Sequence, residues 1–274
     1  MPGVLEGKVA IVTGASRGIG VGIGERFAAE GAAVALVART VEPRPGLPGT
    51  LLETASRIEA AGGRCIVVQA DLADPGSRAR IVDETLSALG PVDILVNNAA
   101  RAFYEPAQAI SEKRLRLSFE INFTAPFDLM QRVIPVMRER GGGWIVNLSS
   151  STSKATAGPP WDDFSRNRGV GTYASTKAAL ERMSLALAAE LHDDGIAVNT
   201  LAPVAAVLTE AAVQLGVIPP EAHTEPLEVM AEAVLALCSG DPRELTGRIA
   251  LSGPLLKDLG IVPRTLDGRT PLAT

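Results

Sequence analysis

The chain has 274 residues, a formal net charge of −5 and a hydrophobic share of 46%. This composition supports a sizeable core and excludes disorder as the main character of the chain. The acidic balance argues against nucleic acid or an anionic membrane surface as the main partner, and no apolar stretch approaches the ~20 residues of a membrane span. The first residues lack the pattern of a signal peptide, so we expect a cytoplasmic protein.

Short apolar runs alternate with helix-compatible stretches along the whole chain. The runs are mostly continuous, which is typical of strands that are covered on both faces. The predicted strands are 9–13, 33–38, 65–70, 93–97, 144–148, 197–202 and 248–252, and the predicted helices are 18–30, 51–61, 77–89, 111–139, 173–192 and 225–238. This order predicts an α/β fold, a single doubly wound domain over residues 1–274 with a seven-stranded, mostly parallel sheet flanked by helices.

Three segments interrupt this alternation. Residues 40–50 contain three prolines and are predicted to form a loop. Residues 151–172 and 201–224 are predicted to be lid segments over an apolar pocket, although a plain hydrophobic connection remains an alternative for the second. In the first lid, Trp161 and Phe164 either line the pocket or only pack the loop onto the body. The aliphatic wall expected from the second lid comprises Val204, Val207, Leu208, Val213, Leu215, Val217 and Ile218.

A glycine-rich turn follows the first predicted strand and opens a helix. Its glycines permit a tight turn and a close approach of the backbone to a phosphate, and the helix N-terminus offers free N–H groups to a pyrophosphate. At the start of a strand–helix–strand series, this turn predicts a Rossmann-like dinucleotide site. The predicted contacts are Gly14, Ser16, Arg17, Gly18, Ile19 and Gly20.

Two short polar runs follow later strands. Asp71 and Leu72 come after the third strand, and Asn98, Ala99 and Ala100 come after the fourth. Ligands of open α/β sheets bind outside the carboxyl ends of the strands, and a carboxylate there can accept a hydrogen bond from an adenine amino group. Each run alone is as compatible with a turn, but together they predict one rim of the nucleotide site.

The candidate acid/base group is a tyrosine. Tyr173 and Lys177 lie four residues apart and share one face of a predicted helix. A nearby cation favours the phenolate and brings the phenol closer to acid/base use near neutrality. The alternative is an exposed Tyr and Lys on a solvated helix face. Serines 149–151 supply a neighbouring hydroxyl, and Asn122 lies in a predicted helix although Asn is a poor helix former.

Cysteine and histidine are too scarce for several other chemistries. Cys65 and Cys238 each lie in an apolar segment, so we expect buried thiols and no disulfide framework. His192 and His223 have no Cys or His neighbours at metal-ligand spacing. We therefore expect neither a metal site nor a Ser-His-Asp triad.

The motifs TGASRGIG, NNAA, INFTAPF, VNLSS, YASTK and VNTLAP occur in an order that resembles the short-chain dehydrogenase/reductase family, from about residue 6 to about residue 252. The resemblance implies a catalytic tetrad of Asn122, Ser150, Tyr173 and Lys177. In it, Tyr173 exchanges a proton with the reacting oxygen and Ser150 hydrogen-bonds the same oxygen. Lys177 lowers the pKa of the phenol and binds the nicotinamide ribose, and Asn122 anchors a water molecule.

The same resemblance implies hydride transfer between a nicotinamide cofactor and a small carbonyl or alcohol, in a homodimer or homotetramer paired through helices 111–139 and 173–192. The alternative is a non-catalytic, dinucleotide-sensing or regulatory protein on the same fold. We expect NADP(H) to be preferred over NAD(H). Ala38 stands where an acidic residue would repel a 2′-phosphate, and Arg39 and Arg17 can bind one, unless both are merely solvated.

The chain also departs from the family pattern. Ala100 stands where the family usually has a glycine. Val204 follows Pro203 at another position where the family usually has a glycine. Thr209 matches the family's carboxamide-binding Thr only with a shifted spacing, yet Pro203 and Thr209 remain predicted cofactor contacts. The tail 253–274 does not resemble the common ending of the family.

Overall fold

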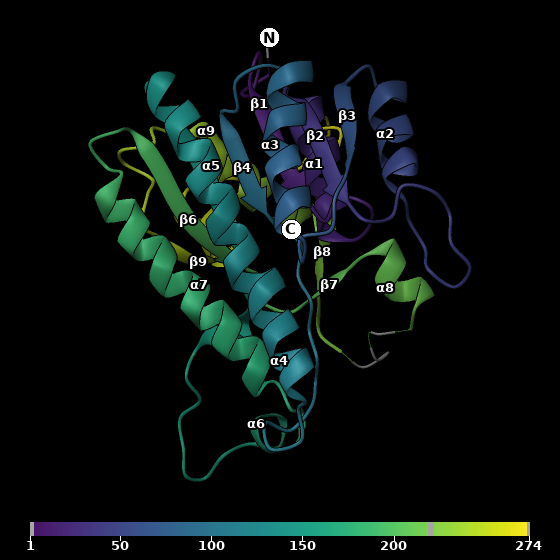
Figure 1. Cartoon of the computed structure of the whole chain (residues 1–274), viewed down its shortest axis with the longest axis vertical. Helices are drawn as coiled ribbons and strands as arrows, with labels where there is room; N and C mark the ends of the chain where they lie inside the picture. The colour runs from purple at the N-terminus through teal and green to yellow at the C-terminus, as the bar shows by residue number, and fades with distance from the viewer. Residues whose placement is uncertain (1–2, 217, 219–221, 273–274) are drawn as a thin grey trace.

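The computed structural model describes residues 3–216, 218 and 222–272. Seven strands form one parallel sheet in the order β3-β2-β1-β4-β5-β6-β9 (Figure 1). The predicted α/β fold and its seven-stranded sheet are therefore confirmed. The strands are β1 (Val9–Thr13), β2 (Ala33–Ala38), β3 (Arg64–Gln69), β4 (Ile94–Asn97), β5 (Gly143–Leu148), β6 (Ile196–Ala202) and β9 (Ile249–Leu251).

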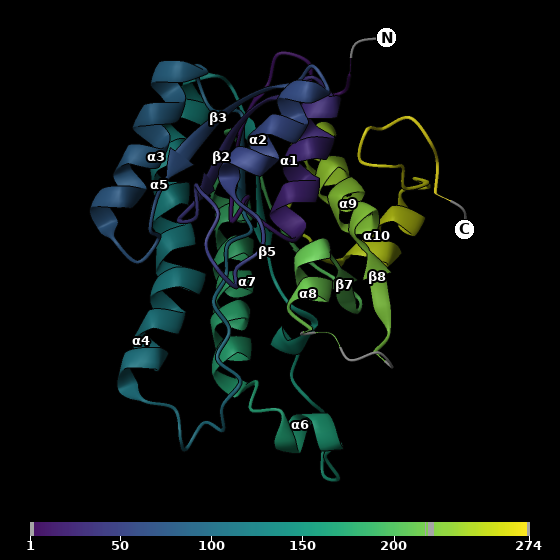
Figure 2. The same ribbon diagram turned by 90° about the vertical axis from the view of Figure 1, so that its right-hand side faces the viewer.

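Helices cover both faces of the sheet, so the core has two parts (Figure 2). On β1, Ala10 and Val12 belong to the part under α1 and α9, whereas Ile11 belongs to the part under α3, α5 and α7. This arrangement explains the continuous apolar runs of the central strands. The long helices are α1 (Ile19–Ala29), α2 (Leu51–Ala60), α3 (Pro75–Ala88), α5 (Ala125–Glu139), α7 (Gly171–Glu190) and α9 (Leu227–Ser239).

The stretch 111–139, predicted as one helix, is interrupted at the candidate asparagine. It consists of α4 (Glu112–Phe119), a π-helical turn η1 (Glu120–Thr124) and α5. The side-chain oxygen of Asn122 accepts from the Arg101 N–H and its amide donates to the Arg101 carbonyl, both at 2.8 Å. The extra residue in the turn aims this side chain at the strand end beside it, and such turns are frequent at functional sites.

The segments between the long elements carry short ones. Residues 40–50 form the predicted loop, and α6 extends from the lower end of the molecule in the first predicted lid (Figure 1). The second predicted lid contains a small two-stranded sheet and α8, while Val217 of its expected wall lies outside the described residues. The short elements are η2 (Ser151–Ser153), α6 (Asp163–Asn167), β7 (Ala206–Leu208), α8 (Glu210–Gln214), β8 (Thr224–Pro226) and α10 (Ser252–Asp258).

The two thiols differ in burial. Cys238 is buried, as expected, whereas Cys65 is only partly buried because it lies on the outer strand β3. Desolvation and the charge of Glu59 raise the pKa of the Cys65 thiol to about 11. Within the described residues, no helix has the length and apolar character needed to cross a membrane.

Candidate active site

The glycine turn packs directly on the NNAA run. A Cβ on Gly20 would come within 2.4 Å of the Gly14 carbonyl oxygen, so only glycine fits there. The Asn98 amide donates to the Thr13 carbonyl at 2.7 Å, and the Thr13 hydroxyl accepts from the backbone N–H groups of Asn98 and Ala99. The ends of β1 and β4 are thereby held together at one rim. Among the described residues, no side chain caps the N-terminus of α1, although the Val21 N–H in its first turn donates to the Gly18 carbonyl at 3.2 Å.

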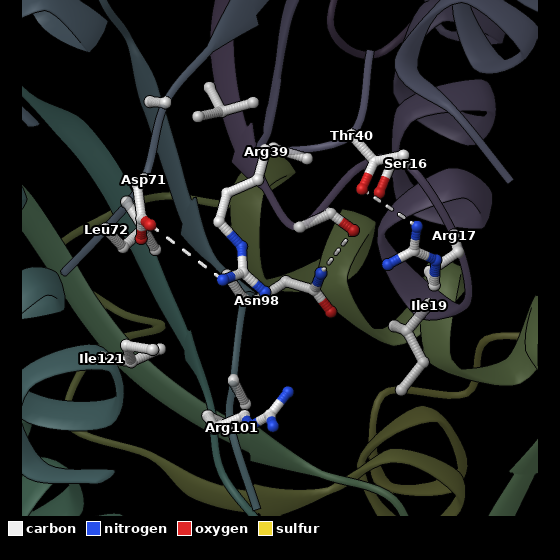
Figure 3. A pocket seen from close by; sticks show the side chains of 16 residues that line it. Ser16, Arg17, Ile19, Arg39, Thr40, Asp71, Leu72, Asn98, Arg101 and Ile121 are labelled. Carbon is white, nitrogen blue, oxygen red and sulfur yellow. Dashed lines mark hydrogen bonds and ion pairs between the residues drawn. The ribbon is translucent and has the colours of Figure 1, made fainter. Parts of the chain in front are cut away.

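A cavity of about 390 Å³ opens between this rim and the ends of β2 and β3 (Figure 3). The structure brings together here most of the predicted cofactor contacts. They are Gly14, Ser16, Arg17, Ile19, Arg39, Asp71, Leu72, Asn98, Ala99 and Ala100. The same cavity is also lined by residues that the motifs did not predict: Thr40, Arg101, Ile121, Val37 and Ala70. The signal for the first two is adjacency, because they directly follow predicted contacts.

A neighbouring cavity of about 380 Å³ lies under α8 and shares Ser16 and Arg17 with the first. Gly18 and Thr209 line it, and the Thr209 hydroxyl caps α8 by accepting from the Ala212 N–H at 3.2 Å. Four predicted cofactor contacts are not among the described residues that line either cavity: Gly20, Tyr173, Lys177 and Pro203. Gly20 instead permits the close packing of the turn.

The turn at Val204, where the chain departs from the family pattern, is held by a contact that the sequence did not predict. The Val204 N–H donates to a carboxylate oxygen of Glu225 at 3.1 Å, and the Ser252 hydroxyl donates to the other oxygen. Glu225 is buried, and desolvation raises its pKa. The turn after β6 is therefore held by a side chain from β8, about twenty residues later in the chain.

Arginines surround the outer end of the first cavity. Arg17 donates from Nε to the Pro48 carbonyl at 2.8 Å and from Nη2 to the Gly49 carbonyl at 3.1 Å and Thr40 Oγ1 at 3.2 Å, so it holds the loop 40–50. This loop-holding role was not predicted for Arg17. Desolvation, together with the charges of Arg39 and Arg44, lowers the Arg17 pKa. The adjoining outer cavity is lined by Arg17, Arg39, Arg44, Arg80 and Arg101.

Lys177 joins α7 to the end of β5. Its ammonium is buried and donates to the Leu148 carbonyl at 2.6 Å, and Nζ lies 5.8 Å from the centroid of the Tyr173 ring. Desolvation lowers the Lys177 pKa to about 8, against the opposing charge of Glu181. A lysine with this pKa is still mostly protonated at neutral pH and is close to releasing its proton.

Tyr173 is protonated at neutral pH in this structure. Desolvation, followed by the neighbouring Tyr104, raises its pKa to about 12, and the Ser150 hydroxyl opposes the rise. The two tyrosine rings pack edge to face with their centroids 6.2 Å apart. The direction is opposite to the lowering by Lys177 that the family resemblance implies, because burial disfavours the charged phenolate. A protonated phenol is the form that donates a proton to a carbonyl oxygen.

The structure places the three candidate serines differently, and Ser151 is exposed at the start of η2. The Ser149 hydroxyl donates to Glu181 at 2.5 Å, and the Ser153 hydroxyl donates to the same oxygen at 2.7 Å. Ser150 instead lies 2.9 Å from the Thr152 hydroxyl and is the serine that contacts the Tyr173 environment. Ser150 therefore remains the predicted catalytic serine.

Asn122 links two parts of this site. Besides its two bonds to Arg101, its amide donates to the Thr176 hydroxyl on α7 at 3.1 Å. It is fully buried, and its side chain contacts protein groups on both sides. The connection after β4 and the helix that carries Tyr173 and Lys177 are thus held by one amide, while the expected water molecule stays a prediction.

Comparison with known proteins decides the family. The sequence profile described as short chain dehydrogenase matches residues 8–216. The chain belongs to this family. It is 32% identical over 259 residues to the hydroxysteroid dehydrogenase-like protein 2 of Xenopus tropicalis, covering 94% of this chain and 60% of that protein. The chain therefore spans about 60% of the length of such relatives.

Solved structures of the family superpose well on this chain. A short chain dehydrogenase from Mycobacterium thermoresistibile is 35% identical with a TM-score of 0.82, covering 94% of this chain and 89% of its own. The L-sorbose reductase of Gluconobacter frateurii, complexed with NADPH and L-sorbose, is 29% identical with a TM-score of 0.75, covering 92% and 97%. A 7α-hydroxysteroid dehydrogenase complexed with NADH and 7-oxo glycochenodeoxycholic acid is 30% identical with a TM-score of 0.77, covering 91% and 94%.

The buried lysine predicts a pH dependence of stability. The pKa of Lys177 is about 8 when folded and close to 10.4 when unfolded, so the unfolded chain binds more protons between these values. The free energy of unfolding should rise across that window, by up to about 3 kcal/mol from this group, because the burial penalty of the charge is relieved. Below pH 8 the full penalty is present.

Urea unfolding at several pH values between 7 and 10 checks this prediction. Lys177→Met removes the titrating group and should lack the rise, while Lys113→Met, on the exposed start of α4, should retain it. Parallel pH profiles of the wild type and Lys177→Met would contradict the assigned lowering.

Proposed function

We propose that this chain is an NADP(H)-dependent oxidoreductase that interconverts a carbonyl and a secondary or primary alcohol on a fairly apolar small molecule. The observation that carries the proposal is the placement of Tyr173, Lys177 and Ser150 at the carboxyl end of β5. The carboxyl ends of the parallel strands share one edge of the sheet, and the cavity beside the glycine turn opens at this same edge, where a cofactor is expected.

The residues around the cavity fit a nicotinamide dinucleotide. The uncapped N-terminus of α1 and the close glycine turn suit a pyrophosphate, Asp71 suits the adenine amino group, and Thr209 lies beside Gly18 in the adjoining cavity. When bound, the nicotinamide supplies or accepts the hydride. The proposed cofactor contacts are those predicted from the sequence, with Gly20 and Pro203 acting through the backbone geometry around them.

The protein residues then handle the proton. Tyr173, protonated at neutral pH, donates to the carbonyl oxygen during reduction, and the Ser150 hydroxyl hydrogen-bonds the same oxygen. The Lys177 ammonium binds the nicotinamide ribose, with Asn122 holding the neighbouring backbone. The complete tetrad favours catalysis over a non-catalytic, dinucleotide-sensing protein, because sensing requires no buried acid/base pair.

The preference for NADP(H) rests on charge. Ala38 brings no carboxylate to the end of β2, and Arg39, with a 60% exposed side chain, lies at the same end together with Arg17 and Arg44. Arg39 Nη1 is 4.0 Å from an Asp71 oxygen, a distance at which an exposed pair contributes little. Since the solved relatives bind NADPH in one case and NADH in another, the arginines and not the similarity support NADP(H).

The apolar substrate is proposed from the two lids. Leu208, Val213 and Leu215 of the second lid are exposed, and so are Trp161 and Phe164 of the first. A bulky carbonyl compound, 7-oxo glycochenodeoxycholic acid, is bound in one solved relative, which supports this proposal. We further propose a cytoplasmic homodimer or homotetramer paired through α4, α5 and α7.

Tyr173→Phe tests the proposed acid. Removing the phenol should lower kcat by a factor on the order of 10² or more, because Tyr173 is the proposed proton donor. NADPH affinity and the melting temperature should stay close to wild type. Turnover is followed by NADPH absorbance with a panel of ketones, aldehydes and quinones, and near-normal kcat in the variant would refute the mechanism.

The double variant Ala38→Asp, Arg39→Ala tests the cofactor preference. The wild type should bind NADPH more tightly than NADH, and the variant should reverse the order because the new carboxylate repels a 2′-phosphate. Titration of cofactor fluorescence gives both dissociation constants. Arg64→Ala, at the far end of β3, is the matched control and should keep the wild-type preference; equal affinities in the wild type would overturn the argument.

Trp161→Ala distinguishes the two possible roles of Trp161, which are lining the substrate pocket and packing the first lid onto the body of the protein. Its ring lies against Gly158 of the same loop and is 53% exposed. If it borders the substrate, KM for a bulky apolar ketone should rise several-fold more than KM for a small polar one, with the melting temperature little changed. A lower melting temperature with a constant KM ratio would remove this support for an apolar substrate.

A further inference from the structure

Arg78 is a buried cation behind the cofactor cavity. It lies on α3, is only 4% exposed and is not among the described residues that line the cavity. Its Nη1 donates to the Leu72 carbonyl at 2.7 Å and to a Glu120 carboxylate oxygen at 2.5 Å. Its Nε donates to an Asp128 carboxylate oxygen at 2.6 Å. One guanidinium therefore joins three segments of the chain.

Two of these segments form walls of the cavity. Leu72 lines it directly, beside Asp71 on the connection from β3 to α3. Glu120 begins the π-helical turn, and the next residue, Ile121, also lines the cavity. In Figure 3, Leu72 and Ile121 lie on the same side of the cavity, across from Arg17. Arg78 thus fixes the spacing between a strand end and the turn that carries Asn122.

Two carboxylates, those of Glu120 and Asp128, stabilise the buried Arg78 cation. Burial disfavours its cation, but the hydrogen bonds and charges of Glu120 and Asp128 outweigh this cost, and its pKa is raised. The two hydrogens of Nη1 point to different acceptors, a carbonyl and a carboxylate. A shorter or apolar side chain cannot reach both, so the distance between the walls depends on the planar guanidinium.

We propose that Arg78 is a positioning residue for the adenosine half of the cofactor, which acts by holding the Leu72 and Ile121 walls at their distance. The proposal rests on the cofactor binding proposed above. It predicts that loss of Arg78 weakens ligands that contain adenosine and leaves the nicotinamide half unaffected, because Lys177 is held by its own bond to the Leu148 carbonyl.

The test compares Arg78→Met, Arg78→Lys and Arg132→Met by calorimetric titration. Arg132 is the matched control because its Nε donates at 2.8 Å to the other oxygen of Asp128, from an exposed position. The ligands are NADPH, 2′,5′-ADP for the adenosine half and reduced nicotinamide mononucleotide for the other half. Melting temperatures are recorded for each variant.

Arg78→Met should bind NADPH and 2′,5′-ADP about tenfold or more weakly, with the mononucleotide changed less than twofold. Arg78→Lys, which keeps a charge and one donor direction, should recover part of the loss, and Arg132→Met should match the wild type. Equal losses for both halves, or no loss, would overturn the proposal.

Two further outcomes are distinguishable. If Arg78→Met does not fold, Arg78→Lys carries the same comparison between the two halves, and its failure to discriminate between them overturns the proposal. If the wild type itself binds neither 2′,5′-ADP nor NADPH, the proposed cofactor use fails first, and the role of Arg78 falls with it.

Discussion

The bond between the Lys177 ammonium and the Leu148 carbonyl is the contact on which the site depends. It brings α7, which carries Tyr173, to the end of β5, which leads into Ser150. Burying a charge is costly, and the lowered Lys177 pKa is the sign of that cost. The same ammonium is the group that we propose to bind the ribose beside the phenol of Tyr173. Stability is therefore given up at the position where chemistry is proposed.

Buried side-chain hydrogen bonds along α7 support this contact. Thr176 accepts from the Asn122 amide, and further along the helix Ser184 accepts from the Asn147 amide at 2.9 Å. Asn147 in turn accepts from Asn97 at 2.8 Å, so β4, β5 and α7 share buried hydrogen bonds. Buried polar groups of this kind are favourable only when they are paired, which fixes one register of α7 against the sheet. Apolar packing alone would tolerate small shifts of the helix.

The features that depend on residues close together in the chain could be predicted from the sequence. The strands at 9–13 and 33–38 match β1 and β2 because continuous apolar runs reflect burial on both faces. The glycine turn and the NNAA run meet as predicted, since parallel strands end at the same edge. The π-helical turn was missed, because one extra residue barely disturbs helical periodicity, although Asn122 was the clue. The contacts of Glu225 and Arg78 join residues up to fifty positions apart, and no spacing rule reveals them.

The two ends of the site differ in construction, and this difference bears on how the protein can change. The end proposed for adenosine is lined by the exposed Arg39 and Arg44, beside the proline-rich loop 40–50 that Arg17 holds through backbone carbonyls. The reacting end is built from buried side chains on β5 and α7 that share hydrogen bonds with the core. Exposed charges can be exchanged at little cost to stability, whereas a buried partner cannot be removed without leaving another unpaired. Cofactor choice should therefore vary readily among related chains while the tyrosine, lysine and their buried supports stay together.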